Sequence, residues 1–577
     1  MNDTTLATAV PHDTDIDDRL LDAGSTATRH LCTGVYVDRS FRDLVIRRIY
    51  NDARHRIAPS YGFDLVPVVR HARRSWLLEI GQLLAMLGVL ITGLLTSEPL
   101  ATVIVACAVL SCRLLTGIAR ELPDVFHGLV RTLTTRLGLP VGTRRRTDPD
   151  PRSRKRRIKV MFVCLLATLM VPPVLSYFLG SPITSALVPA AVIGSGLIVC
   201  AFVAGILRQA LLISLVGTTR PHTLTRREEI IDEQQRHPCV IFQRPPHREG
   251  SLDPLELLKQ TDKPSPFVGS GKLVNHWQLG SQLLRPGEGS MEEREYITPP
   301  FTAHQLVEAL RVELKKLALD TGRESLPGLR VRDRIYIAAN DLPADGSLTR
   351  RGLGKLEIRD RIDDHRLPGH HFLETSVPIV GGELVATVLI QVSLKGRSLS
   401  LDVATCALTR TPETFHVPDW YGEHNSGALL RSAARHVAAL PTDVMRIWRL
   451  LEIPVVVVGA RRARRDHTTV PRRRSVGPDL ALREEIADSW DNAQLDSTTI
   501  YDHMKIVELR ILKATEDFLR KHEVDTSAFE KKATNIINSG VLNMGASQMT
   551  VQQMVAGMGA QLNNNANAGG NGEGAVA

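Results

Sequence analysis

Residues 76–95 read WLLEIGQLLAMLGVLITGLL, and this stretch decides the class of the fold. At 1.5 Å per residue, about 20 helical residues cross the roughly 30 Å hydrocarbon core of a bilayer. Runs of similar character occupy residues 100–118, 160–179 and 185–216. Apolar residues make up 43% of the chain and are concentrated in these four runs, a distribution that is typical of a membrane protein. The sequence therefore predicts four α-helical transmembrane spans.

Charged residues in the connecting loops predict the orientation of the spans. Residues 144–159, RRRTDPDPRSRKRRIK, join the second and third spans and carry nine basic residues and two acidic ones. Loops rich in Lys and Arg stay on the cytoplasmic side, whereas the turns TSEP and GSPIT contain neither residue. We therefore expect a multi-pass protein of two hairpins in a bacterial plasma membrane, with both termini in the cytoplasm.

The net charge of +9 is carried mostly by arginine next to the apolar runs. This placement favours contact with anionic lipids of the inner leaflet. Nucleic acid is not expected as a partner, because the chain lacks aromatic-basic interleaving and zinc-finger spacing. The seven cysteines form no CxxC pair, so neither a disulfide framework nor a zinc ribbon is expected.

Two ionisable side chains, Glu79 and Arg113, interrupt the apolar runs. Both fall in the inner half of the bilayer at similar depth, which allows an intramembrane ion pair between two helices. In the alternative, both side chains extend toward the inner headgroups. Such a pair would be the gate if the chain were a transporter or channel subunit.

The remaining residues divide into five parts around the transmembrane region, 76–217. Residues 1–75 form a cytosolic N-terminal region, in which 40–57 predict an amphipathic helix that lies near the inner leaflet or packs on the cytosolic part. Residues 218–425 form a cytosolic α+β domain, 426–475 a basic amphipathic segment at the membrane surface, 476–532 a helical segment, and 533–577 a low-complexity tail rich in Gly, Asn and Gln. Such a tail is either disordered or self-assembling through stacked strands.

Within the α+β domain, β-rich runs over 238–243, 334–339, 371–380, 383–394 and 399–408 predict strands. Gly381 and Gly382 suit a hairpin turn. Residues 301–319 predict a helix with Thr302 as its N-cap. In the basic segment, IPVVVVG at 453–459 is too short to span a bilayer, and we expect a buried strand or a segment that dips into the inner leaflet.

Three motifs could indicate a phosphate, metal or catalytic site, but each matches its pattern only in part. SPFVGSGKLVNHW, at 265–277, lacks the first glycine of a P-loop and its Ser or Thr after Lys272, so we expect a glycine turn and no phosphate cradle. The loop DDHRLPGHHFLET has the nearest approach to a metal cluster, but His370 and His371 point to opposite faces if the segment is extended. His416, Asp419 and His424 are acid-base candidates without a recognisable nucleophile. We therefore assign no catalytic residue, metal ligand or cofactor.

Four sequence blocks, in this order along the chain, carry a resemblance to a known group of proteins. They are APSYGFDLVPVVRHA, PFVGSG, LPGLRVRDRIYI and HEVDTSAFEKKATNIINSG, with the two membrane hairpins after the first. In these blocks the chain resembles uncharacterised integral membrane proteins of actinobacteria, over residues 33–540. The bias of arginine over lysine fits a GC-rich genome. That family has no assigned activity, so the resemblance implies a location and no mechanism.

These observations favour a membrane-anchored interaction or signalling module of unknown molecular activity. An unknown protein partner, bound through the tail, and a homo-oligomer are both compatible with this interpretation. The alternative is a transporter or channel subunit. A membrane-tethered enzyme is less favoured, because it rests only on the residues around His370.

Overall fold

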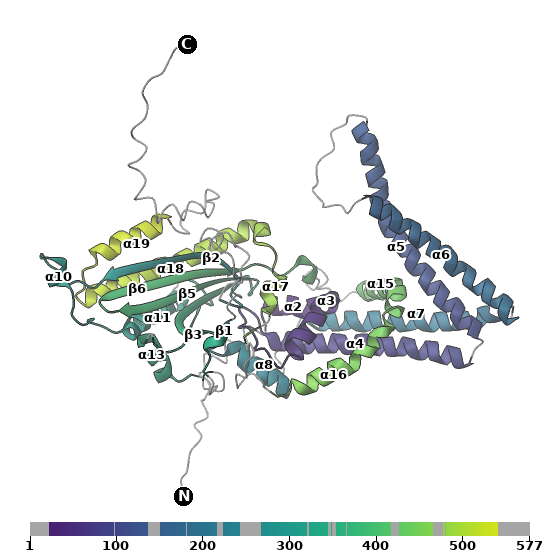
Figure 1. Ribbon diagram of the computed structural model, residues 1–577, viewed down its shortest axis with the longest axis horizontal. Helices are drawn as coiled ribbons and strands as arrows, with labels where there is room; N and C mark the ends of the chain where they lie inside the picture. Colours follow the sequence, from purple (N-terminus) through teal and green to yellow (C-terminus); the bar gives the residue numbers. More distant parts are fainter. Residues whose placement is uncertain are drawn as a thin grey trace, which may run out of the picture.

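The computed structural model describes residues 22, 24–96, 99–136, 151–180, 182–215, 223–242, 267–319, 322, 324–343, 348, 353–364, 366–416, 426–465, 477–478 and 480–539. A body of sheet and helices lies at one end, and long helices extend from it (Figure 1). Of the predicted tail, 533–577, residues 540–577 fall outside these residues, as does much of the basic loop, whereas residues 533–539 belong to the helix α19 (Ser527–Ser539).

Four helices in the described part of the chain are long and apolar enough to cross a membrane. They are α4 (Leu65–Thr96), α5 (Pro99–Arg136), α6 (Pro151–Leu179) and α7 (Ile183–Ser214). The predicted spans are thus confirmed as helices, and their composition suggests a membrane protein. Glycines bring α4 and α7 together, since a Cβ on Gly93 would meet Ile193 at 2.6 Å and one on Gly196 would meet Val89 at 3.1 Å.

The body contains a six-stranded mixed sheet within the described residues, in the order β1-β3-β4-β5-β6-β2. The strands are β1 (Cys239–Phe242), β2 (Lys272–Gln282), β3 (Arg330–Ala338), β4 (His370–Ile379), β5 (Leu384–Lys395) and β6 (Ser398–Leu408). β1 and β3 are parallel, and the other neighbours are antiparallel. Gly381 and Gly382, with φ of +62° and +85°, make the turn between β4 and β5 as predicted.

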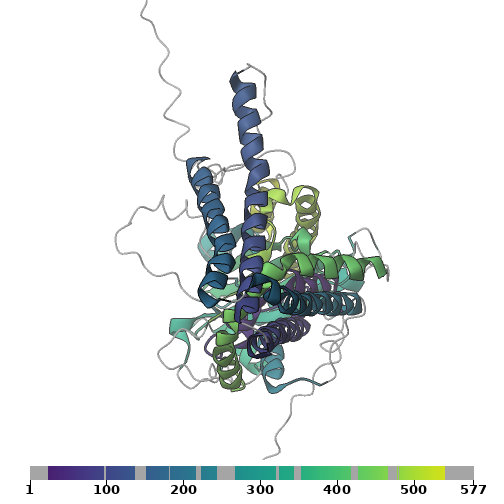
Figure 2. The same ribbon diagram turned by 90° about the vertical axis from the view of Figure 1, so that its right-hand side faces the viewer.

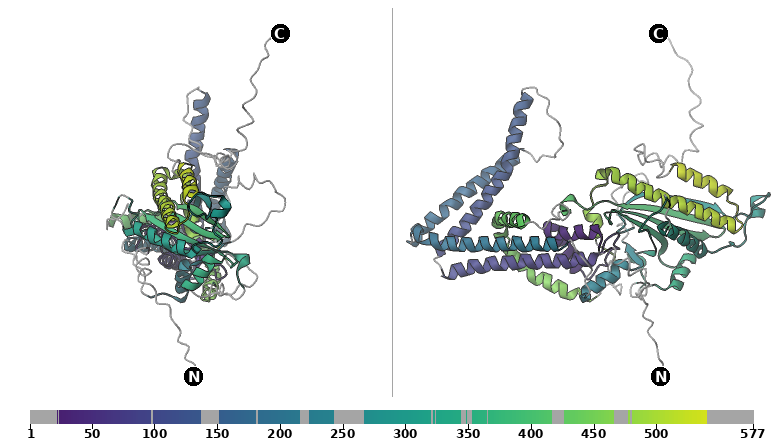
Figure 3. Two further views of the ribbon diagram at one scale, coloured as in Figure 1. Left: turned by 90° about the vertical axis from the view of Figure 1, so that its left-hand side faces the viewer. Right: turned by 180° about the vertical axis from the view of Figure 1, so that it is seen from behind.

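Helices cover one face of the sheet. α11 (Ala303–Leu319) and α18 (Gln494–Lys521) lie side by side on it, and α19 (Ser527–Ser539) lies next to α18 (Figure 3). Leu310, Met504 and Ile511 are fully buried there against Leu373 and Val388 of the sheet. Thr302 caps α11 as predicted, since its Oγ1 accepts from the backbone N–H of Gln305 at 3.4 Å. The shorter helices of the body are α10 (Met291–Arg294), η3 (Ala339–Asp341), α13 (Lys355–Asp363), α17 (Leu482–Ile486) and η6 (Trp490–Asn492).

The segment before the four apolar helices is part of the body. α2 (Thr26–Val37), α3 (Arg39–Leu44) and a π-helix, η1 (Val45–Tyr50), pack against the start of α4, α8 (Arg226–Arg236) and η4 (Glu413–Phe415). Phe41, Val45 and Ile49 are buried in this shared core. Of the two alternatives for residues 40–57, the structure has the packed one, and the helix ends at Tyr50.

Two local expectations are corrected. The buried-strand alternative for IPVVVVG is wrong: the segment forms α16 (Ile453–Arg462), with Pro454 in its first turn and Val455 74% exposed, while its placement in the inner leaflet stays a prediction. β2 was not expected as a strand, because its sequence KLVNHWQLGSQ follows a glycine turn and alternates polar with apolar residues only over the four residues His276 to Leu279. Before α16, the basic segment forms α15 (Ser426–Val444) and η5 (Ile447–Glu452).

Candidate functional site

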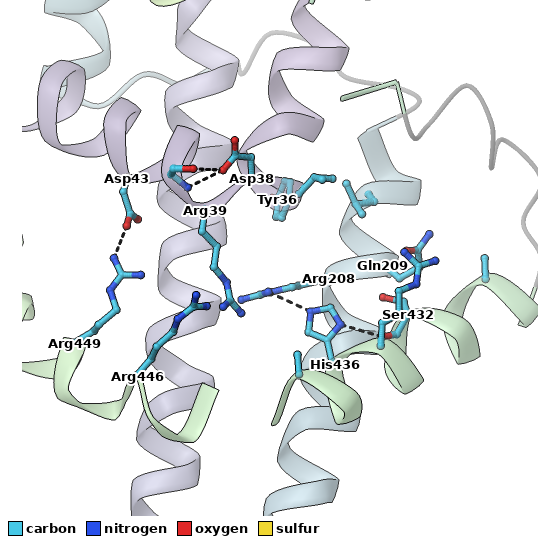
Figure 4. A pocket seen from close by; sticks show the side chains of 16 residues that line it. Tyr36, Asp38, Arg39, Asp43, Arg208, Gln209, Ser432, His436, Arg446 and Arg449 are labelled. Atoms are coloured by element: carbon cyan, nitrogen blue, oxygen red, sulfur yellow. Dashed lines mark hydrogen bonds and ion pairs between the residues drawn. The ribbon is translucent and has the colours of Figure 1, made fainter. Parts of the chain in front are cut away.

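A cavity of about 680 Å³ opens where α4 and α7 enter the body (Figure 4). Its walls come from the α2–α3 junction, the end of α7, α15 and the start of η5. Five arginines line it and only two aspartates, Asp38 and Asp43; the arginines are Arg39, Arg208, Arg435, Arg446 and Arg449. The site therefore combines segments that are far apart in the sequence and carries an excess of positive charge.

A network of ion pairs behind the cavity holds three of these segments together. Glu79 of α4 accepts from Arg42 of α3, and its other oxygen lies 3.5 Å from Arg449 and 3.8 Å from Arg39. Asp443 of α15 lies 2.8 Å from Arg39. Arg42 and Glu79 are only 1% and 4% exposed. Because buried charges need partners, this network links the pre-membrane segment, α4 and the chain that returns from the sheet.

Arg208 of α7 differs from the paired arginines. Its side chain is 6% exposed, and Nε and Nη2 have no hydrogen-bond partner among the described residues. Nη1 donates to Nε2 of His436 at 3.1 Å, while Nδ1 of His436 donates to the Ser432 carbonyl at 2.9 Å. Burial, together with the charges of Arg208 and Arg39, lowers the pKa of His436, so the ring is neutral at pH 7. Arg208 is thus a buried cation whose direct partner is a neutral ring.

α15 crosses α7 at a glycine. A Cβ on Gly205 would lie 2.7 Å from Cα of Ala433, and Ser432 Oγ donates to the Gly205 carbonyl at 3.1 Å. α15 is seen nearly end-on in Figure 1, where α4 and α7 run across the page, and along its length in Figure 2. This crossing brings Arg435 and His436 over the end of α7.

The structure does not bring Glu79 and Arg113 together. Glu79 has the arginine partners described above, and Arg113 is half-buried on α5 without an ion pair in the described part of the chain. No sequence pattern indicated that Glu79 would pair with Arg42 and Arg449, because both arginines lie outside the apolar runs. Both predicted residues nevertheless lie in helices that suit a membrane.

The glycine turn before β2 points two backbone N–H groups at one carboxylate oxygen of the same chain. The backbone N–H groups of Gly269 and Gly271 donate to one oxygen of Glu484 at 2.8 and 2.7 Å. Burial raises the pKa of Glu484 to about 7, against the lowering effect of these two bonds. Both glycines have φ of +94°, and a Cβ on Gly271 would collide with the Ala407 carbonyl oxygen. The turn therefore binds a carboxylate of its own chain.

A His–Glu–His group lies between α2 and the sheet. His30 Nδ1 and Glu383 Oε1 are 2.7 Å apart, His416 lies 4.0 Å from the other oxygen, and Thr411 donates to that oxygen at 2.9 Å. Against the effect of burial, the His30 bond, the charge of Arg483 and the Thr411 N–H lower the pKa of Glu383 to about 2. The potential ligand atoms lie within 4.8 Å of one another, but the two imidazole rings stack at 4.0 Å. Stacked rings keep their nitrogen lone pairs in two nearly parallel planes about 4.0 Å apart, which makes it hard for both to converge on one ion, so the group suits a hydrogen-bond network better than a metal ion.

The residues around His370 separate as the strand period predicts. His371 is buried and bonds Asp333 at 2.8 Å, whereas His370 is exposed at the start of β4. Glu374 is buried elsewhere, where it accepts from Arg334 at 3.0 Å. Asp363 accepts from the backbone of His304 at 2.9 Å. His365, Asp419 and His424 lie outside the described residues.

Sequence reasoning placed the arginines of α15 at the membrane surface but missed the cavity. The available signals were Arg208 near the end of an apolar run and the adjacent Arg435 and His436 on an amphipathic helix. What no pattern supplied was the packing of α15 across α7. Long-range packing of this kind has no local sequence period.

Comparison with known proteins gives a family likeness for the second half of the chain. Residues 276–551 match the model of the AbeC-like domain, a domain of unknown function. The match begins inside β2 and includes α15 and η5, while the four apolar helices lie outside it. No curated protein and no solved structure matched the chain. The similarity to the AbeC-like domain thus covers most of the sheet, its helices and one wall of the arginine-lined cavity, and assigns no activity.

Proposed function

We propose that the chain is an integral protein of the bacterial plasma membrane that acts as an interaction or signalling module on the cytoplasmic side. Four apolar helices cross the bilayer as two hairpins, and both termini lie in the cytoplasm. The apolar helices and the basic loop between α5 and α6 support this placement. The resemblance to actinobacterial membrane proteins is consistent with it.

One observation carries the proposal: the membrane helices and the cytosolic body share a single packed junction. Val66 and Val69 of α4 and Leu215 after α7 are buried in one core with Phe415. A short flexible tether would suffice to anchor a domain. A packed junction instead transmits displacements between α4, the end of α7 and η4, which follows the strand β6, because tightly packed interfaces are not continuously deformable.

Arg483 adds a second connection of the same kind. Its fully buried guanidinium donates to the carbonyls of Tyr61 at 3.0 Å and Thr409 at 3.4 Å, and also to the carbonyl of Glu383. The segment before the membrane helices, the sheet and the segment after α16 are therefore joined at one side chain. A protein partner bound to the tail would therefore contact a body that is packed directly against α4 and α7.

Membrane topology is tested first, with a cysteine introduced at Leu319. This side chain is 83% exposed at the end of α11, whereas the native Cys239 and Cys406 are buried and their thiol pKa values are raised by burial to about 11 and about 12. A membrane-impermeant maleimide should label Leu319→Cys only after cells are lysed. Thr96→Cys, at the exposed end of α4, is the matched control that should label in intact cells. Labelling of Leu319→Cys in intact cells would place the body outside and end the proposal.

A capture experiment tests the interaction role. Native membranes are cross-linked, and the full chain is compared with one that ends at Ser539, the last residue of α19. Loss of a discrete partner or of a homo-oligomer from the shorter chain supports an interaction module. If both chains are captured alone while vesicles show solute flux, the transporter interpretation replaces it.

A further inference from the structure

The arginine-lined cavity has the features of a binding site that needs an anion. Arg208 is buried, lines the cavity and leaves two of its N–H-bearing nitrogens without a partner in the described part of the chain. An unpaired buried charge is costly. Glu79 and Asp443 attract Arg208 at longer range, but its direct hydrogen-bond contact is the neutral His436. A second anionic group in the cavity would remove this cost.

The geometry around Arg208 is suited to a tetrahedral oxyanion. Arg39 and Arg446 both lie near Asp443, at 2.8 and 3.8 Å from its Oδ1, so their guanidinium groups gather at the same wall. Figure 4 shows them reaching into the cavity from α3 and from the start of η5, with Arg208 coming from α7. Planar guanidinium groups bind phosphate through paired N–H donors. The exposed Arg435 also lines the cavity and has no ion pair in the described part of the chain, so it is available as a further donor.

The depth of the cavity indicates where the anion comes from. α7 begins at Ile183, and at 1.5 Å per residue Arg208 lies roughly 38 Å along it. This exceeds the roughly 30 Å hydrocarbon core, so Arg208 reaches the level of the inner headgroups. Val37, Leu212 and Ala439 supply an apolar part of the lining. A volume of about 680 Å³ is larger than a single phosphate requires and suits a larger ligand.

We propose that this cavity binds a phosphate-bearing group, held by Arg208 and Arg435 at the inner face of the membrane. The shared chemistry is a phosphate monoester or diester. Its source is either the headgroup of an anionic phospholipid or a soluble phosphate compound. The lipid source rests on the membrane placement proposed above, and the soluble source does not.

Two probes distinguish the sources. The purified full chain in detergent is titrated with phosphatidylglycerol, with phosphatidylcholine for comparison, and the bound lipid is counted by native mass spectrometry. Inorganic phosphate is titrated separately and followed by thermal unfolding. The variants are Arg208→Gln, which removes the charge and keeps an amide donor, and Arg435→Gln, where Arg435 is exposed and the chain should fold normally. Arg431→Gln is the matched control, because Arg431 is exposed on the same helix outside the cavity lining.

A charge-assisted hydrogen bond lost from such a site corresponds to roughly a 10- to 100-fold weaker affinity. We expect this loss in Arg208→Gln and Arg435→Gln and not in Arg431→Gln. Selective loss of phosphatidylglycerol identifies the lipid source, and the same pattern with inorganic phosphate alone identifies the soluble source. The inference is overturned if wild type binds neither probe, or if the cavity variants bind as tightly as Arg431→Gln. Failure of the topology test alone would remove the lipid source and leave the phosphate titration valid.

Discussion

Replacement of Glu79 by glutamine tests the ion-pair network behind the cavity. The substitution keeps the size of the side chain but removes the charge that faces Arg42, which is 1% exposed. Arg42 would retain Asp43, at 3.1 Å, and Asp43 is shared with Arg449. Breaking a buried pair from one side costs about 3 to 5 kcal/mol. We expect the low end of this range, because the amide oxygen can still accept one hydrogen bond.

The assay is thermal unfolding of the purified chain in mild detergent, followed by tryptophan fluorescence. About 3 kcal/mol corresponds to a decrease in Tm of roughly 6 to 12 °C for a domain of 150 to 250 residues. Arg113→Gln is the comparison: it should change the free energy of unfolding by less than about 0.5 kcal/mol, since Arg113 has no ion pair in the described residues. A double-mutant cycle of Glu79→Gln with Arg42→Gln should show strong coupling. The reasoning is refuted if Glu79→Gln leaves the Tm unchanged, or if Glu79 couples to Arg113 more strongly than to Arg42.

Glu508 is buried on α18, and Trp277 Nε1 donates to it at 3.1 Å; burial raises its pKa to about 7 despite this bond. The tryptophan fluorescence of the wild type should therefore titrate near pH 7, and Glu508→Gln should abolish that transition. Glu484 follows the same rule in the glycine turn, with a pKa of about 7. Since the raised pKa favours the protonated form in the folded state, stability falls as pH rises from about 4.5 to about 7, and Glu484→Gln should stabilise the chain at pH 8 by roughly 1 to 3 kcal/mol. A chain that ends at Ser539 should unfold at the wild-type temperature, whereas one that ends at Lys532 cuts through α19 and should unfold earlier.

Each of these predictions has an internal check. Glu485→Gln, on the exposed side of α17, should leave the pH dependence unchanged. An equal effect of Glu485→Gln and Glu484→Gln would show that net charge is responsible, not the glycine turn. A fluorescence transition that persists in Glu508→Gln would assign it to another group. For the shortened chains, equal unfolding temperatures would mean that Ala533 and Ile536 contribute nothing where they pack on the sheet core.

Features that repeat along the chain could be predicted from the sequence. Apolar runs identified α4 to α7, and β-rich runs identified five of the strands, because both depend on residues close in sequence. β2 was not predicted as a strand because Asn275 near its start, and His276 and Gln278 on its exposed face, are polar residues with low β propensity. The strand alternative for residues 453–459 was wrong. A run of four valines favours a strand locally, but Pro454 suits the first turn of a helix. Tertiary context decided between these preferences.

The candidate site could not be predicted, since its charges find partners across long separations. Arg39 and Asp443 are 404 residues apart, and Arg208 and His436 are 228 apart. The sequence indicated only that arginines lie near the membrane. Whether an arginine there faces lipid, a carboxylate or a cavity depends on how α15 crosses α7.

The bond between Arg483 and the Tyr61 carbonyl sets an order of events during synthesis of the protein. These residues are 422 positions apart. At about 5 to 20 residues per second, roughly 20 to 80 s pass before the ribosome supplies Arg483 to a segment that has already been made. During this interval α4 to α7 leave the ribosome, while Tyr61, which packs against Val385 and Leu408 of the sheet in the finished fold, has no sheet to cover it. The segment around Tyr61 is therefore buried only after the sheet and Arg483 have been made.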